Sequence, residues 1–142
     1  MKKATQKKHV LKEKTLKFAI RIVNLNRHLV YEKREFVLSK QILKSGTNPG
    51  AMAREAANAE SGKDFIHKLS IAQKENGETQ YWLELLHATD FISKAEFDSL
   101  SSDCEEIGKI ITSSIKTKKR NLGLKTFLFL IFATTYLTWL IL

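Results

Sequence analysis

Apolar residues recur at helical spacing between residues 11 and 31, on two nearly opposite faces of the helix that this spacing predicts. One face holds Leu16, Ala19, Ile20, Val23 and Val30, and the other holds Phe18, Ile22, Leu25 and Leu29. A surface helix of a monomer needs only one apolar face. The pattern therefore predicts a helix between its own bundle and a neighbouring subunit. A helix on a membrane surface is the weaker alternative, because it would have one large apolar face.

A second helical pattern starts near Arg34 and runs to Leu43, just before the segment KSGTNPG. A phosphate-binding loop needs a Gly-Lys-Ser or Gly-Lys-Thr sequence after a strand, and this part of the sequence has neither. Gly46 is suited to end one helix, and Pro49 is suited to the first position of the next. We therefore expect the second helix to be kinked or split between Gly46 and Gly50.

The third pattern is unusually long and runs from Gly62 to about His87, after Ser61, which can cap its first turn. Asn76 lies on the main apolar face, where it can fix the register of the bundle as a buried polar residue. Alternatively, it can reach water at a bend beside Gly77. The opposite face presents Ile71, Tyr81 and Leu85, which we assign, with Phe18, Ile22, Leu25 and Leu29, to an oligomer interface.

A Ser-x-x-Glu capping box at Ser93 and Glu96 predicts the start of a fourth helix, whose apolar stripe continues to about residue 117. Cys104 lies in this stripe and is interpreted as a small core residue rather than a reactive thiol. No alternating pattern indicates a strand. The sequence therefore predicts an all-α protein with an antiparallel, up-down four-helix bundle over residues 11–118. A basic arm over residues 1–10 precedes it, and a basic linker with an apolar helical tail over residues 119–142 follows it.

The last 17 residues, 126–142, carry no charge. As a helix they would span about 26 Å, near the lower limit for crossing a membrane. The candidate membrane residues are Phe127, Leu130, Tyr136 and Trp139. Packing of the tail on the oligomer is the alternative. Basic residues beside an apolar segment favour the cytoplasmic side, so we expect a cytoplasmic bundle, held at the inner face of the cell membrane if the tail inserts.

The net charge of +9 is unevenly distributed, because residues 1–34 contain eleven Lys and Arg but only two acidic residues. In an up-down bundle, the start of the first helix and the end of the fourth helix lie at the same end. We therefore predict a basic rim there, which would bind nucleic-acid phosphates or anionic lipid headgroups. The rim consists of Lys7, Lys8, Lys12, Lys14, Lys17, Arg21, Lys116, Lys118, Lys119 and Arg120.

Residues that could carry catalysis are scattered, and no nucleophile and base have a recognisable spacing. Asp64-x-x-His67 and Glu84-x-x-His87 have the spacing used in di-metal four-helix bundles, but both histidines lie off the main apolar stripe. We therefore expect no enzymatic activity, no cofactor and no metal site. The single cysteine, Cys104, rules out an internal disulfide and favours a reducing compartment.

Residues 45–86 resemble a bacterial family of four-helix-bundle proteins encoded in intervening sequences of large-subunit rRNA genes. The most specific segments are REA, KDFIHKLSIA and ETQYWLELL, and the likeness covers about residues 12–118. The accessory protein of diversity-generating retroelements is a relative. The resemblance implies a homopentamer with a nucleic-acid-binding basic surface and, by analogy with the retroelement protein, a reverse transcriptase as partner. Asn48-Pro49 and Met52-Ala53 depart from the family pattern, and the apolar tail lies outside it.

Two functions are consistent with these features. The first is a non-enzymatic, oligomeric accessory or scaffold protein that binds the backbone of RNA or DNA. Such binding would be weakly sequence-specific, because the aromatic residues form no stacking platform. The second is a tail-anchored membrane scaffold, whose basic rim meets anionic lipid and whose bundle recruits a protein partner.

Overall fold

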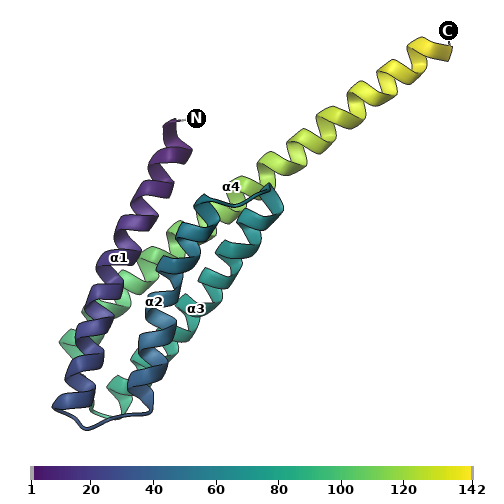
Figure 1. Cartoon of the computed structure of the whole chain (residues 1–142). Helices are drawn as coiled ribbons and strands as arrows, with labels where there is room; N and C mark the ends of the chain where they lie inside the picture. The colour runs from purple at the N-terminus through teal and green to yellow at the C-terminus, as the bar shows by residue number, and fades with distance from the viewer. Residues whose placement is uncertain (1, 142) are drawn as a thin grey trace.

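Four α-helices make up the computed structural model, which describes the backbone of residues 2–141 and the side chains of residues 9–133. The helices are α1 (Lys2–Tyr31), α2 (Leu38–Ala57), α3 (Gly62–Ala88) and α4 (Lys94–Ile141). Successive helices run in opposite directions, so α1 begins and α4 leaves at the same end of the bundle (Figure 1). The predicted all-α, antiparallel four-helix bundle is confirmed, and the described backbone contains no strand.

Each helix of the bundle packs on two neighbours. α1 contacts α2 and α4, and α3 contacts the same two helices, so α1 and α3 occupy diagonal positions. The core between the four helices is built mainly from Leu, Ile and Ala, with Phe18 and Cys104 as the other apolar members. The outward faces of α1 and α3 consequently point to opposite sides of the protomer.

The two apolar faces of α1 have different surroundings. Phe18, Ile22, Leu25 and Leu29 are buried in the core of the bundle. Leu16 and Ile20, on the opposite face, are 51% and 54% exposed. The assignment of Phe18, Ile22, Leu25 and Leu29 to a subunit interface is therefore wrong. The larger side chains turn inward because they remove more apolar surface from water than the face that includes Ala19 and two valines.

α2 is one continuous helix through the segment that was predicted to be a joint. Gly46 does not adopt a positive φ, and Pro49 is buried inside the helix. Thr47 donates its hydroxyl proton to the carbonyl oxygen of Leu43 at 2.8 Å, within the same helix. The predicted split is therefore absent, and the predicted kink is not confirmed. Gly46 has a packing role instead, because a β-carbon there would lie only 2.8 Å from Cγ1 of Ile22 on α1.

A carboxylate cap, which the sequence analysis missed, starts α2 at Leu38 rather than near Arg34. Arg34 has a φ of 56°, a left-handed conformation that interrupts the helical path. The Glu35 carboxylate then accepts hydrogen bonds from the backbone N–H groups of Val37, Leu38 and Ser39 at 2.8, 2.8 and 2.6 Å. Burial alone would raise the pKa of Glu35, but these hydrogen bonds outweigh it and lower the pKa.

The predicted caps of α3 and α4 are both present. Ser61 Oγ accepts a hydrogen bond from the backbone N–H of Asp64 at 3.0 Å. At the start of α4, Glu96 Oε2 accepts from the backbone N–H of Ser93 at 2.8 Å, and Ser93 Oγ accepts from the backbone N–H of Glu96 at 3.3 Å. The side-chain hydrogen bond from Ser93 also lowers the pKa of Glu96. Each cap satisfies backbone N–H groups that have no partner within the helix.

A polar link between α3 and α4 involves Asn76. Its side-chain amide donates to the carbonyl oxygen of Cys104 at 3.0 Å, and the Cys104 thiol donates to the carbonyl oxygen of Asn76 at 3.3 Å. Gly108 leaves room for the amide, because a β-carbon there would lie 3.1 Å from Asn76 Nδ2. Asn76 is buried, so the structure favours the role in helix register over contact with water at a bend.

Both ends of the chain are more helical than the sequence analysis predicted. α1 begins at Lys2, where a loose arm was expected, and α4 continues from Lys94 to Ile141 without a linker. Lys and Arg are good helix formers and no proline interrupts residues 119–125, so the isolated Gly123 is tolerated. The 48 residues of α4 correspond to a length of roughly 70 Å, and the helix projects far beyond the bundle (Figure 1).

Two glycines in helices should respond oppositely to substitution by alanine. Gly46→Ala should lower the free energy of unfolding by about 1–2 kcal/mol, because the clash with the buried Ile22 outweighs the gain in helix propensity. Gly77→Ala is the matched control and should raise it by about 0.5–1 kcal/mol, because nothing lies within 4 Å of the added methyl group. Urea denaturation of both variants measures this; a stabilised Gly46→Ala protein would contradict the close approach of α1 and α2.

Cys104 should be inert while the protein is folded. The thiol is buried, and burial raises its pKa to about 12, so almost no thiolate forms at neutral pH. Reaction with Ellman's reagent in native buffer should be on the order of a thousandfold slower than in urea, because it requires opening of the core. Since the chain has one cysteine, the unfolded protein is its own control. Rapid modification of the native protein would contradict this packing.

Candidate nucleic-acid interface

The basic part of α4 lies at the end of the bundle where α1 begins (Figure 1). It crosses the start of α3, because a β-carbon on Gly62 would lie 3.0 Å from Cε of Lys118. The Lys118 ammonium also lies 5.5 Å from the centre of the Phe65 ring, a cation–π contact. The structure therefore places the start of α1 and the basic part of α4 at the same end of the bundle, as the up-down topology predicts. The side chains of Lys7 and Lys8 lie outside the described residues.

A cluster of cations on α4 lacks acidic partners. Lys116, Lys119 and Arg120 are exposed, and none of the ion pairs among the described side chains involves them or Lys12. The chain contains no Asp or Glu after Glu106. We call Lys12, Lys116, Lys118, Lys119 and Arg120 the cationic end. Its uncompensated charge makes it the part of the predicted rim best suited to attract phosphates.

The other predicted rim residues on α1 are paired with carboxylates. Lys14 Nζ lies 2.8 Å from Glu106 Oε2, and Lys17 Nζ lies 2.7 Å from Glu13 Oε1. The hydrogen bond to Glu106 raises the pKa of Lys14. Exposed pairs of this kind contribute little to stability, but they neutralise the charge that a phosphate would meet.

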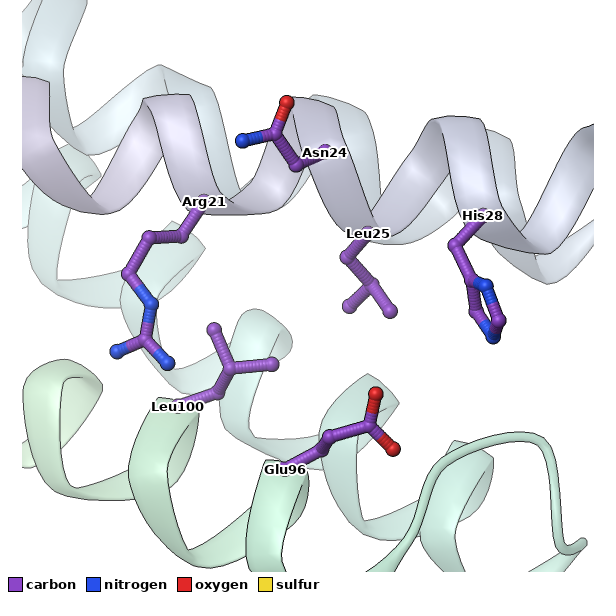
Figure 2. A pocket seen from close by; sticks show the side chains of 6 residues that line it. All are labelled: Arg21, Asn24, Leu25, His28, Glu96 and Leu100. Carbon is purple, nitrogen blue, oxygen red and sulfur yellow. The ribbon is translucent and has the colours of Figure 1, made fainter.

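Arg21 is held between α1 and α4. Its guanidinium pairs with Asp103 and donates to Ser99 Oγ at 2.7 Å. Beside it lies a hollow of about 380 Å³, lined by Arg21, Asn24, Leu25, His28, Glu96 and Leu100 (Figure 2). Its lining includes the positive Arg21, the negative Glu96 and the apolar Leu25 and Leu100. A neighbouring groove is lined by Lys14, Lys17 and Arg21 together with Asp103 and Glu106. These three cations are therefore compensated by carboxylates rather than forming an open cationic surface.

Two acidic residues, which were not predicted as part of the site, neutralise this groove. Asp103 and Glu106 are three residues apart on α4, and they face Arg21 and Lys14, which are seven residues apart on α1. Both spacings place side chains on one helical face. The signal was therefore present in each helix, but pairing the two faces requires the antiparallel register of α1 and α4.

The histidines at the candidate metal spacing have other surroundings. His87 stacks on Phe97, with ring centroids 5.0 Å apart and an interplanar angle of 15°. His67 is exposed at the other end of α3. Within the part of the chain that the structure describes, no three His, Cys, Asp or Glu side chains lie together as metal ligands would.

Three candidate interface residues lie on the outer side of α3. Tyr81 is 56% exposed, and its ring meets Trp82 edge-on with centroids 4.9 Å apart. Ile71 and Leu85 are half-buried. On α1, the exposed large apolar residues are Leu16 and Ile20, on the face opposite the buried Phe18, Ile22, Leu25 and Leu29. Two partly apolar surfaces thus lie on diagonal helices.

The candidate membrane residues lie on the part of α4 beyond the bundle. Phe127 and Leu130 are exposed, whereas Tyr136 and Trp139 lie outside the described side chains. Within the residues that the structure describes, no helix combines the length and apolarity needed to cross a membrane. The membrane helix predicted over residues 126–142 is therefore not confirmed.

Comparison with known proteins identifies the family. The model of the 23S rRNA-intervening sequence protein family matches residues 7–113. The chain belongs to this family. A solved structure from Bacteroides thetaiotaomicron, described as a protein of unknown function from the S23 ribosomal protein family, is 55% identical to this chain. It superposes with a TM-score of 0.77, over 78% of this chain and 98% of that chain. No curated protein matches the sequence.

The family model covers most of the bundle but not the end of α4. The 23S rRNA-intervening sequence protein family model stops at residue 113, just before the basic segment. The family member from Bacteroides is matched over nearly its whole length, while about a fifth of this chain remains unmatched. The bundle is therefore the family's common part, and the basic and apolar segments after residue 113 lie outside the family model.

Proposed function

We propose that the protein is a non-enzymatic homo-oligomer that binds the backbone of RNA or DNA through its cationic end, as an accessory or scaffold protein. The observation that carries the proposal is the group of cations at the bundle end that pair with no described carboxylate. Phosphates would supply the missing counter-charge. The family's association with rRNA intervening sequences supports a nucleic-acid partner, and such a partner is consistent with a cytoplasmic protein.

The chemistry of the cationic end favours backbone contacts over base recognition. Lys116, Lys119 and Arg120 are long, exposed side chains on one helix, without a neighbouring sheet of stacking aromatics. Tyr81 and Trp82 lie in the last third of α3. This helix begins at the end where α4 leaves the bundle and runs away from it (Figure 1). Lys and Arg contacts to phosphates carry no sequence information. Binding should therefore be steeply salt-dependent and weakly sequence-specific.

The apolar faces of α1 and α3 support self-association. Ile20 and Leu16 are exposed on one side of the protomer, and Tyr81 is exposed on the other. A contact between two different surfaces is heterologous and leaves one of each available for further copies. A ring is the closed form of such an assembly, and five copies is the number that the family resemblance implies. Each copy would add one cationic end to the ring.

Removal of three cations should reduce the salt dependence of RNA binding. The variant Lys116→Gln/Lys119→Gln/Arg120→Gln should weaken binding at low salt at least tenfold and lower the slope of log K against log salt by about 2 to 3, because each phosphate contact contributes about 0.7–0.9. The variant Arg27→Gln/Lys40→Gln/Lys44→Gln is the matched control, since it removes the same charge from exposed sites elsewhere. Filter-binding titrations measure both. If both variants lost the same RNA affinity, binding would depend on net charge alone, and the proposed role of the cationic end would be wrong.

Two substitutions test the heterologous contact. Ile20→Glu and Tyr81→Glu should each convert the oligomer to a protomer of 16.3 kDa, because each places a charge in one of the two apolar faces. An equimolar mixture should form a dimer, because one variant retains an intact α1 face and the other an intact α3 face. Light scattering after size-exclusion chromatography measures all three samples. A wild-type monomer, or a mixture that stays monomeric, would refute the proposed α1–α3 contact.

A further inference from the structure

The end of α4 exposes apolar side chains on every side of the helix. Leu122 is the last residue shown to approach the bundle, since its Cδ2 would lie 2.8 Å from a β-carbon on Gly62. Beyond it, at 100° per residue, five exposed side chains are distributed around the whole circumference. They are Leu124, Phe127, Leu128, Phe129 and Leu130, of which Phe129 is 72% exposed. The segment therefore has no polar face to turn toward water.

We propose that this extension of α4, from Leu122 onward, docks into an anionic lipid surface. A helix that is apolar on all sides is stable where its surroundings are apolar on all sides. One partner helix would cover a single stripe and leave the rest of the circumference in water. Lipid acyl chains can surround the helix completely.

The charge of the preceding turns distinguishes lipid from a second copy of the chain. Lys116, Lys118, Lys119, Arg120 and Lys125 surround α4 just before or within the start of the apolar extension, and no acidic residue follows Glu106. A parallel bundle of α4 ends from several copies would bring these cations together with no carboxylate to compensate them. Anionic headgroups supply that compensation at the depth where the cations would lie.

Docking would hold the basic and the apolar side chains of α4 at different depths in the lipid surface. The basic turns would remain among the headgroups while Phe127 and Phe129 reach the acyl chains.

Lipid docking would use the same cations as the proposed RNA binding, but it also needs the apolar extension and can be measured without RNA. Full-length protein should float in a density gradient with vesicles of phosphatidylcholine and phosphatidylglycerol. It should prefer them at least tenfold over phosphatidylcholine alone, because each cation near an anionic surface contributes about fivefold. Phe127→Gln/Phe129→Gln should reduce flotation at least tenfold, while leaving the net charge and RNA binding unchanged.

A matched variant and a second measurement keep the result unambiguous. Phe36→Gln/Val37→Gln replaces two exposed apolar residues at the opposite end of the bundle and should float like the wild type. Equal flotation of the wild type and Phe127→Gln/Phe129→Gln would overturn the proposal. A second result would also overturn it: the wild type binds neither vesicle type, light scattering shows that it assembles, and Phe127→Gln/Phe129→Gln abolishes the assembly. The extension would then bind other copies of itself rather than lipid.

Discussion

The close approach of α1 and α2, where Ile22 faces Gly46, sets the rotation of α1 in the bundle. With Ile22 directed inward, Phe18, Leu25 and Leu29 follow it into the core, because they share its helical face. Leu16 and Ile20 are then left outside. The same rotation points Lys14 and Arg21 at the carboxylates of α4. One packed contact between two helices thus decides which apolar residues of α1 are exposed and which cations are neutralised.

Local signals in the sequence predicted much of the fold. Ser61, Ser93 and Glu96 cap their helices as expected, because capping depends on residues within one turn. The start of α2 was misplaced, because Arg34 takes a left-handed conformation that usually favours Gly or Asn, and Glu35 reaches forward to cap the helix from outside it. Gly46 was misread as a helix end, since its role depends on Ile22, 24 residues earlier in the chain.

The candidate interface was predictable only in part. The topology placed both basic segments at one end, because helix order and loop length are sufficient to derive it. Whether each cation is compensated depends on side chains from another helix, and no spacing within α1 shows that Arg21 meets Asp103. For the same reason, the sequence revealed two apolar faces on α1 but not which one is buried. The continuity of α4 was missed, because a run of basic residues was interpreted as a linker, although Lys and Arg favour a helix and one glycine does not end it.

The buried link between Asn76 and Cys104 has a consequence for the geometry of α4 as a whole. A slip of one helical turn between α3 and α4 would leave the side-chain amide of Asn76 and the thiol of Cys104 without their partners in an apolar core. The link therefore fixes the position of α4 along the bundle axis. It acts in the middle of the bundle, many residues before α4 projects beyond it. The length of α4 outside the bundle is consequently the same in every molecule.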